Sequence, residues 1–440
     1  MALVTVIGAG GSTISLTMTS AANAQIAQQL LNGVSQSVQG GSVTPFNYSG
    51  QGPLHVPNGS SMMVLTGPGS VTIPATTGTV FDTSTQRDVL FGGTAASQLI
   101  ISGDSGITYF GNTGSGTVIA GGGDNTIILG GGSTGSGGND DDGHGRGHGR
   151  DRGNGEDDDR NRRSDNEARR GQNGRDGRDE GDGRDGHGER DGHDGNGHAT
   201  VPAIGGHLVL TGGGNDQIYA LAGNVTIGAG GGNNTIVLGT GMASVISTGF
   251  DDIQAGAGAA TVDATAGRDL INGSAGTLLF IGGASASTIF GGSGAVTAAG
   301  GSGGGMFAGG SDGGNLLRAG SGAATLFGAA DGDRLLGGTA ADSLMAGTGH
   351  ETLTGGAGTD AFTFERGNGG HDLITDFTLG SDTLVLDGFN KNEFVNDLKS
   401  AKAVAGGVSV TLSDHTVLTF SNLNTTDLKS ITVVSSGSNH

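Results

Sequence analysis

Side chains that carry oxygen recur every 18 residues in the C-terminal half of this chain. Asn315, Asp333 and Glu351 form one series with this spacing, and Asp342 and Asp360 form a second. If 18 residues make one coil of a stacked β structure, the members of each series lie one strand spacing apart, about 4.8 Å. Carboxylates at that distance repel one another unless a cation lies between them. Calcium prefers six to eight hard oxygen ligands, so the spacing indicates a calcium-binding edge.

Two earlier pairs have the same spacing. Asp216 lies 18 residues before Asn234, and Asp251 lies 18 residues before Asp269. Asp and Asn also suit turns that need positive φ, so a turn without a ligand is the alternative for every one of these positions. We prefer calcium for residues 310–363 and leave both interpretations open for 211–271. The corresponding positions between residues 272 and 309 are Leu278, Ser287 and Val296, and those coils are expected to bind no metal.

The 18-residue spacing arises from two nonapeptides per coil. Residues 337–363 consist of GGTAADSLM, AGTGHETLT and GGAGTDAFT without a gap. The last of these matches every fixed position of G-G-x-G-x-D-x-U-x, where U is a large apolar residue. Gly355, Gly356 and Gly358 permit positive φ, which turns backbone carbonyls toward Asp360, while Phe362 is expected to point into a narrow core.

This nonapeptide resembles the calcium-binding repeat of RTX (hemolysin-type) proteins. Residues 360–389 resemble the segment that closes the β-roll in RTX proteins exported by type I secretion, such as the C-terminal domain of serralysin-type proteases. The resemblance implies calcium as the cofactor, a parallel β-roll and an uncleaved C-terminal export signal. It is weaker upstream, where the G-G pair is often eroded and most repeats lack Asp. The matching elements are Asp360 to Phe364, Gly369, Asp372, Ile374, Asp376, Phe377, Gly380, Asp382 and Leu384.

The composition favours a repeat architecture over an ordinary globular fold. The chain has 440 residues, of which 95 are Gly, with 15 Phe, 3 Tyr and no Trp or Cys. Glycine costs roughly 1 kcal/mol per helical position relative to Ala, which argues against a helix-rich fold. Spaced apolar residues then favour an all-β parallel β-roll or β-solenoid with small α/β caps. The net charge of −21 argues against nucleic acid and anionic membranes as partners, and no apolar run is long enough to span a bilayer.

The nonapeptide period divides the chain into five segments. Residues 1–82 are expected to form an N-terminal cap and irregular β structure. Residues 83–132 and 201–363 are two parts of one solenoid, because AGGGDNTIILGGG before residue 133 is echoed by AGGGNNTIVLGTG after residue 200. Between them, 133–200 is rich in Asp, Arg, Gly and His and holds no large apolar residue, which predicts a disordered insert. Residues 364–440 are the C-terminal cap and type I secretion region.

Both caps are expected to contain a short helix. At the N-terminus, a strand at 3–7 precedes a helix at about 21–38, with Ile26, Leu30, Leu31 and Val34 on the face that covers the open end of the solenoid. The alternative is a cleaved secretory signal ending at Ala24, although the segment lacks Lys and Arg. At the C-terminus, a helix at about 391–403 and two strands are expected. Four phenylalanines there would plug the last coil: Phe362, Phe364, Phe377 and Phe389.

The motifs predict a binding or structural protein and not an enzyme. The zinc-protease motif H-E-x-x-H is not matched, since Thr-Leu-Thr follows His350-Glu351, and there is no G-x-S-x-G elbow or P-loop. We therefore expect a secreted, extracellular or surface-associated calcium-binding solenoid with a structural or adhesive role at the bacterial surface or in a matrix. Its expected partners are calcium ions, surface or matrix polysaccharide and a type I exporter. The rival is a polysaccharide lyase or hydrolase that uses paired carboxylates of the solenoid.

Overall fold

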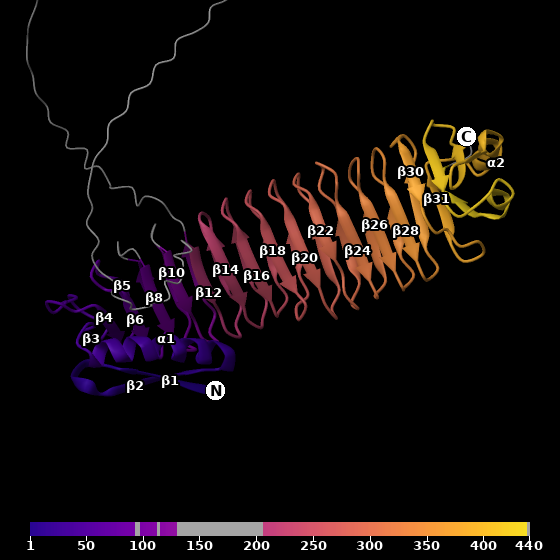
Figure 1. Cartoon of the computed structure of the whole chain (residues 1–440). Helices are drawn as coiled ribbons and strands as arrows, with labels where there is room; N and C mark the ends of the chain where they lie inside the picture. Colours follow the sequence, from indigo (N-terminus) through magenta and orange to yellow (C-terminus); the bar gives the residue numbers. More distant parts are fainter. Residues whose placement is uncertain (93–96, 112–114, 130–205, 438–440) are drawn as a thin grey trace, which may run out of the picture. The chain divides into compact units, whose positions relative to one another are not determined.

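The computed structural model describes residues 1–92, 97–111, 115–129 and 206–437. Most of these residues belong to a parallel β-solenoid, which confirms the predicted all-β fold. Successive strands alternate between two sheets along the chain, so that each coil contributes one strand to each sheet (Figure 1). The predicted disordered insert at 133–200 lies outside the described residues.

The first sheet, here called sheet I, has 15 strands in the order of the sequence. Its strands are β5 (Ser70–Thr72), β7 (Asp88–Phe91), β9 (Ile107–Phe110), β11 (Thr126–Leu129), β13 (Gln217–Ala220), β15 (Thr235–Leu238), β17 (Asp252–Gln254), β19 (Leu270–Asn272), β21 (Ser287–Phe290), β23 (Gly305–Ala308), β25 (Ala324–Phe327), β27 (Ser343–Met345), β29 (Ala361–Glu365), β31 (Thr383–Asp387) and β35 (Thr432–Ser435).

The second sheet, sheet II, faces sheet I across the core and ends in an antiparallel hairpin at the C-terminal cap. Its strands are β3 (Pro45–Tyr48), β4 (Met62–Leu65), β6 (Thr79–Asp82), β8 (Ser97–Ser102), β10 (Ser115–Ile119), β12 (Gly206–Leu210), β14 (Asn224–Ala229), β16 (Ala243–Ser247), β18 (Ala260–Ala264), β20 (Leu278–Gly282), β22 (Val296–Ala299), β24 (Leu316–Gly320), β26 (Arg334–Gly338), β28 (Thr352–Gly356), β30 (His371–Ile374), β34 (Val417–Phe420), β33 (Gly407–Thr411) and β32 (Lys402–Val404).

The core consists of inward apolar side chains, one to three from each parallel strand, and each large one is stacked on its counterpart in the next coil. In sheet I these are the U positions of the nonapeptides; Ile218, Ile236 and Ile253 occupy successive coils and are fully buried. In sheet II, Ile227 and Val245 stack in the same way. β-branched side chains suit such stacking because they pack well on a pleated surface.

The solenoid begins before the first recognisable nonapeptide. Residues 1–82, predicted to form an N-terminal cap and irregular β structure, contain β3 to β6, which pair in parallel with one another and with the later coils. The prolines of this segment are compatible with these strands, because Pro45 is the first residue of the edge strand β3, while Pro68 and Pro74 lie between strands. Further on, β10 pairs with β12 and β11 with β13, so the coil before residue 130 stacks on the coil after residue 205.

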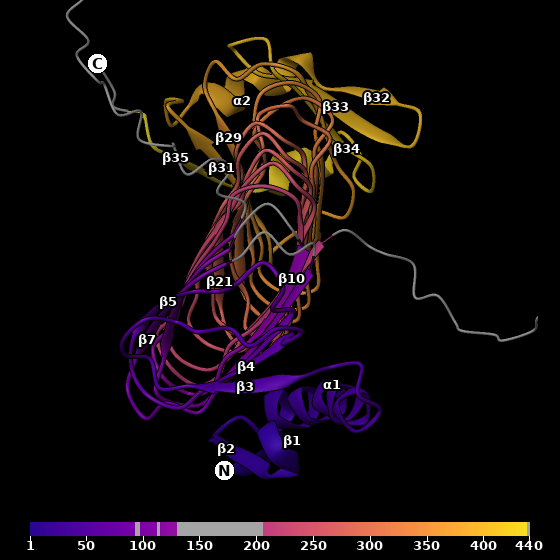
Figure 2. The ribbon, with the colours of Figure 1, turned by 90° about the vertical axis from the view of Figure 1, so that its left-hand side faces the viewer.

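The N-terminal residues form a hairpin and a helix that cover a side of the solenoid and not its end. Strands β1 (Ala2–Ile7) and β2 (Thr13–Met18) are antiparallel and flank the short helix η1 (Ala9–Gly11). Helix α1 (Ala21–Gln39) runs along the first strands of sheet II (Figures 1 and 2). The predicted position over the open end is therefore wrong. The helix and hairpin cover outward residues of sheet II strands, among them Val64, Phe81, Ile101 and Ile119.

The buried face of α1 also differs from the prediction. Leu31 is fully buried, but Ile26 and Leu30 are 36% and 39% exposed. Asn23 sets the rotation of the helix, because its buried amide donates hydrogen bonds to the carbonyls of Ala120 and Thr211 at 3.3 and 2.8 Å. The apolar pattern alone did not reveal this polar anchor.

The C-terminal cap extends the core with aromatic side chains. The rings of Phe362 and Phe377 have centroids 5.6 Å apart, and Phe420 meets Phe377 edge-on at the same distance. The four predicted plug residues are all buried. The predicted helix at 391–403 is shorter than expected, because Lys402 already belongs to β32. The helical elements of the cap are α2 (Glu393–Asp397), η2 (Leu398–Ser400) and η3 (Asp427–Ser430).

Within the described ranges, no helix combines the length and the apolar character that crossing a bilayer would require.

The observed rotation of α1 predicts which of its leucine and isoleucine side chains matter for stability. Leu31→Ala should lower the free energy of unfolding by about 2–5 kcal/mol, because it leaves a cavity between the helix and sheet II. Ile26→Ala should change it by less than about 1 kcal/mol, since that side chain is already partly in solvent. Chemical denaturation of both variants measures the difference; equal effects would contradict the observed packing.

Candidate metal centre

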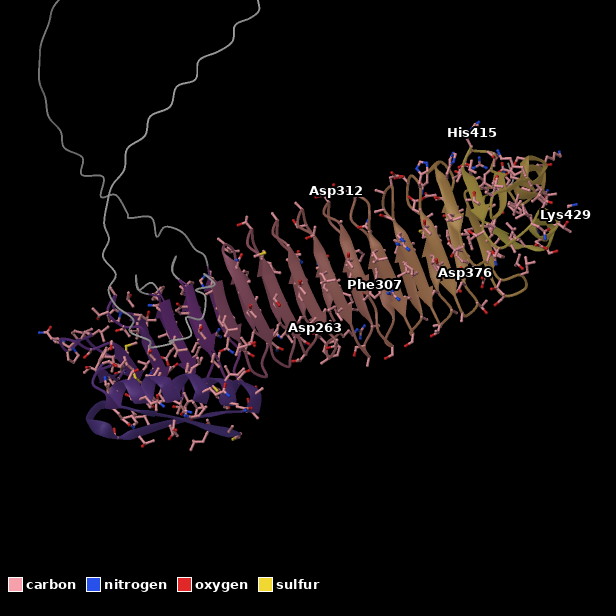
Figure 3. All side chains as sticks on the ribbon, in the orientation of Figure 1. Asp263, Phe307, Asp312, Asp376, His415 and Lys429 are labelled. Atoms are coloured by element: carbon pink, nitrogen blue, oxygen red, sulfur yellow. The ribbon has the colours of Figure 1, made fainter. Side chains whose placement is uncertain are left out.

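The oxygen-bearing side chains at the sixth repeat position form two buried columns, each running along one edge of the core. Every member is at most 3% exposed, unlike Asp312 at the third position of its repeat, which projects from a turn (Figure 3). Column I, before the strands of sheet I, contains Asn125, Asp216, Asn234, Asp251, Asp269 and Ser287, and later Asp342, Asp360 and Asp382. Column II, before the strands of sheet II, contains Asn315, Asp333, Glu351 and Asp372.

Some residues that the 18-residue spacing assigned to separate pairs, or to no pair, belong to the same column. Asp216, Asn234, Asp251 and Asp269, predicted as two pairs, are one run, because the coil between Asn234 and Asp251 has 17 residues. Asn125, Asp372 and Asp382 were not predicted as site residues, since their partners lie 91, 21 and 22 residues away. The signal that could have found them is an Asp or Asn directly before an apolar strand, whatever the length of the coil.

Backbone hydrogen bonds link the members of each column. The N–H of one sixth-position residue donates to the side-chain oxygen of the next coil. The distances from nitrogen to oxygen are 2.9 Å from Asp342 to Asp360, 3.0 Å from Asp360 to Asp382 and 3.1 Å from Glu351 to Asp372. These links give each accepting carboxyl a donor for one of its oxygens, because each coil supplies a single such N–H.

At the asparagine steps, the side-chain amide adds a second donor to the same oxygen that accepts from the backbone N–H. Nδ2 of Asn125, Asn234 and Asn315 donates to Oδ1 of the next carboxylate at 2.9, 2.7 and 2.8 Å. The same nitrogen also donates to a glycine carbonyl of its own turn, for example Gly310 at 2.8 Å from Asn315. The asparagine amide therefore lies between two oxygen acceptors, the next carboxylate and a turn carbonyl. A proton or a cation would have to occupy this position if the residue were an aspartate.

With or without such an amide, most of the predicted carboxyl ligands keep one oxygen that no described protein group satisfies. Within the described residues, six of the predicted ligands have a buried carboxyl oxygen without a hydrogen-bond partner. A buried acceptor left in this state costs about 1–3 kcal/mol. A cation would satisfy these oxygens together with nearby turn carbonyls, so the donor set fits calcium. The six residues are Asp216, Asp251, Asp269, Asp342, Glu351 and Asp360.

Asn315 and Asp333 need no cation to satisfy their side-chain oxygens. Oδ1 of Asp333 accepts from the backbone N–H and the amide of Asn315, both at 2.8 Å. Its Oδ2 accepts from the N–H groups of Ala329 and Ala330 at 2.7 and 3.2 Å. Protein groups alone therefore satisfy both oxygens of Asp333. In column II, Glu351 is the first residue whose oxygens fit a bound cation.

The predicted glycine ligands serve the turn in different ways. A Cβ on Gly355 would lie 2.6 Å from Oδ2 of Asp360, so only glycine leaves room for the folded carboxyl. Gly356 and Gly358 have positive φ of 92° and 142°. The N–H groups of Gly355 and Gly356 donate to the two oxygens of Asp376, each at 2.8 Å, while the carbonyl of Gly358 accepts from Ser381.

The burial of these carboxyls makes their charged form unfavourable. Burial, with a smaller contribution from Asp251, raises the pKa of Asp269 to about 6. Burial and then Asp360 raise the pKa of Asp342 to about 6. Burial, followed by the adjacent Asp372 carboxyl, raises the pKa of Glu351 to about 9. The folded state therefore favours a proton or a compensating cation at each of these carboxyls, most strongly at Glu351.

In the part of the chain that the structure describes, no three His, Asp or Glu side chains already surround a single point as metal ligands would. A bound cation would thus depend on one or two carboxylates per site, with turn carbonyls and water as the other ligands. No protein-family model matches this chain, and no curated protein matches it either.

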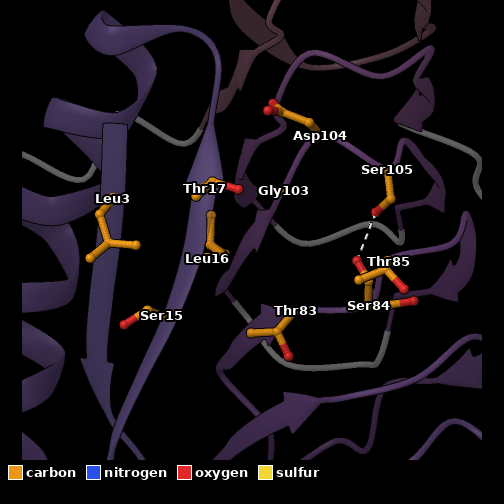
Figure 4. Close-up of a pocket in the computed structure, with 10 residues that line it drawn as sticks. All are labelled: Leu3, Ser15, Leu16, Thr17, Thr83, Ser84, Thr85, Gly103, Asp104 and Ser105. Atoms are coloured by element: carbon orange, nitrogen blue, oxygen red, sulfur yellow. Dashed lines mark hydrogen bonds between the residues drawn. The ribbon is translucent and has the colours of Figure 1, made fainter. Parts of the chain in front are cut away.

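The alternative function, a polysaccharide lyase or hydrolase, requires paired carboxylates in a substrate site. A cavity of about 420 Å³ lies between the β1–β2 hairpin and the solenoid turns (Figure 4). Leu16, Thr83 and Ser105 are among its lining residues, and Asp104 is the one carboxyl among them. Oδ1 of Asp104 accepts hydrogen bonds from the backbone and hydroxyl of Thr19 and from the N–H of Gly122. Asp104 therefore attaches the hairpin to the solenoid, and this cavity has no second carboxylate for glycoside chemistry.

The raised pKa values predict that the metal-free protein loses stability as the pH rises. The ordinary values are 3.8 for Asp and 4.5 for Glu, and the folded values are about 6 for Asp269 and Asp342 and about 9 for Glu351. At pH values between the ordinary and the folded pKa of a group, the folded state binds more protons than the unfolded state. The free energy of unfolding therefore falls as the pH rises through this range. In chelator, the melting temperature should fall between pH 5 and about pH 9. Glu351→Gln should remove the alkaline part of the fall, whereas Glu365→Gln, on an exposed side chain, should not. A flat profile for the unsubstituted chain would contradict the assignment.

The asparagine steps predict how an aspartate step can be repaired. In chelator at pH 8, Asp342→Asn should raise the free energy of unfolding by about 1–3 kcal/mol, because its amide can donate to Asp360 as Asn315 does to Asp333. Asp333→Asn is the matched control and should destabilise, since its new N–H group would face donors that now bind Oδ2. Thermal melting of both variants gives the comparison; the same sign for both would exclude this account of the columns.

Proposed function

We propose that this chain is a secreted calcium-binding β-solenoid of the RTX type, with a structural or adhesive role at a bacterial surface or in an extracellular matrix. The observation that carries the proposal is the set of buried, stacked carboxyls with oxygens that no protein group satisfies. Calcium suits them better than magnesium, because it tolerates irregular geometry and takes only oxygen ligands, including carbonyls.

The same columns connect binding to folding. A charged carboxylate that is buried without a donor for both oxygens destabilises the stack when no cation is bound, and binding free energy then becomes folding free energy. Calcium is scarce in the cytosol and abundant outside cells, so the coils would stay loose until export. The resemblance of residues 360–389 to the roll-closing segment of type I substrates supports this order of events.

We propose no catalytic role for the columns. Catalysis by paired carboxylates requires both groups to face a substrate groove. Here Asp342, Asp360 and Glu351 are each at least 97% buried, and their nearest groups are backbone N–H donors and one another. Polysaccharide is therefore proposed as a binding partner of the solenoid surface and not as a substrate.

Calcium should raise the melting temperature of the full chain in a saturable way. In chelator at pH 8 the β circular dichroism should be lost at a lower temperature than in millimolar calcium, and millimolar magnesium should have a smaller effect. Asp360→Asn should reduce the calcium-induced rise, because it removes one anionic ligand. Asp312→Asn, at an exposed position outside the columns, is the matched control and should not. Calcium binding measured calorimetrically as absent, with unchanged melting, would refute the proposal.

A further inference from the structure

Two histidines stack on each other at the outer edge of column II. His350 lies before β28 and directly precedes Glu351, while His371 is the first residue of β30 and directly precedes Asp372. The pairing of Thr352 with Leu373 places the two histidines on neighbouring coils. Their ring centroids are 5.3 Å apart, with the ring planes tilted by 41°. Both side chains are exposed, so they are accessible to an ion from solvent.

A carboxylate holds one of the two rings in place. Oδ1 of Asp331 accepts a hydrogen bond from the backbone N–H of His350 at 2.8 Å and lies 2.8 Å from Nδ1 of the same residue. With a proton on Nδ1, His350 donates to Asp331 and keeps the lone pair of Nε2 for a ligand. Metal-binding histidines are commonly oriented by a carboxylate in this manner.

We propose that His350 and His371 form a binding site for a divalent transition-metal ion of the zinc, nickel or copper class. Two imidazoles bound to one tetrahedral ion, with bonds of about 2.0–2.1 Å, place their ring centroids about 5 Å apart, which the observed spacing matches. Water takes the remaining positions, because the described residues offer no third side chain arranged for the same point. Nitrogen donors select these ions over calcium, so the site is chemically distinct from the carboxylate columns.

The surroundings favour a cation at this place. Glu351 and Asp372 lie buried immediately behind the histidines, and both oxygens of Glu351 are without a hydrogen-bond partner. The ion would also join the segment before β28 to the first residue of β30, two neighbouring strands that share few residue pairs. β28 and β30 share two residue pairs, whereas β26 and β28 share four. Metal bound across His350 and His371 therefore acts as a clamp where the regular coils meet the C-terminal cap.

The test is zinc binding by the full chain in the presence of excess calcium. Calcium keeps the carboxylate columns occupied, so that a failure of this proposal is separable from a failure of the calcium proposal. Zinc bound at equilibrium is measured by dialysis for the unsubstituted chain, His350→Ala, His371→Ala and the exposed control His55→Ala. The five histidines between residues 133 and 200 contribute equally to all four proteins.

The unsubstituted chain and His55→Ala should bind one zinc equivalent more than either variant at the pair, or bind it at least tenfold more tightly. Asp331→Asn should weaken this equivalent severalfold without removing it. Zinc should also raise the melting temperature of the unsubstituted chain but not of His350→Ala, whose circular dichroism without zinc should be unchanged. Equal zinc binding by all four proteins, or full displacement of the zinc by calcium, would overturn the proposal.

Discussion

The constraint on which this structure depends is that parallel stacking places each side chain against its counterpart in the next coil, about 4.8 Å away. For apolar residues this like-on-like contact is favourable, and the column of Ile218, Ile236 and Ile253 is a continuous core. For buried acidic residues the same contact is unfavourable, because desolvation and mutual repulsion act together. The two oxygen-bearing columns are the places where the fold must resolve this conflict.

The chain resolves this conflict with one of two devices at some steps and with neither at others. Asparagine supplies a neutral donor, as at Asn315 above Asp333. Turn N–H groups satisfy the second oxygen of Asp333. At Asp342, Asp360 and Glu351 neither device is present among the described residues, and the free oxygens mark where an external cation is most needed. The repeats are therefore not equivalent, although their backbone paths are.

Strand pairing, and not coil length, maintains the stack. The side-chain link from Asn125 to Asp216 spans 91 residues, yet it has the same geometry as the 17-residue link from Asn234 to Asp251. The strands on either side of the long connection between β11 and β12 still pair in register, and lengthening such a connection costs little closure entropy. The solenoid can thus carry long insertions, and its end is covered by a cap whose phenylalanines continue the apolar column.

The sequence by itself determined the period, the inward apolar positions and the column-forming residues of the regular repeats. Those features are local, because a nonapeptide with glycine, an acidic residue and a large apolar residue at set positions has one compatible strand and turn. The tertiary structure decided what depends on contacts between distant segments. It placed α1 on the side of sheet II through the bonds of Asn23, and it aligned Asn125 with Asp216 and Glu351 with Asp372. It also showed that Asp333 is satisfied while Asp342 is not, because hydrogen-bond completion depends on which donors the neighbouring coils supply.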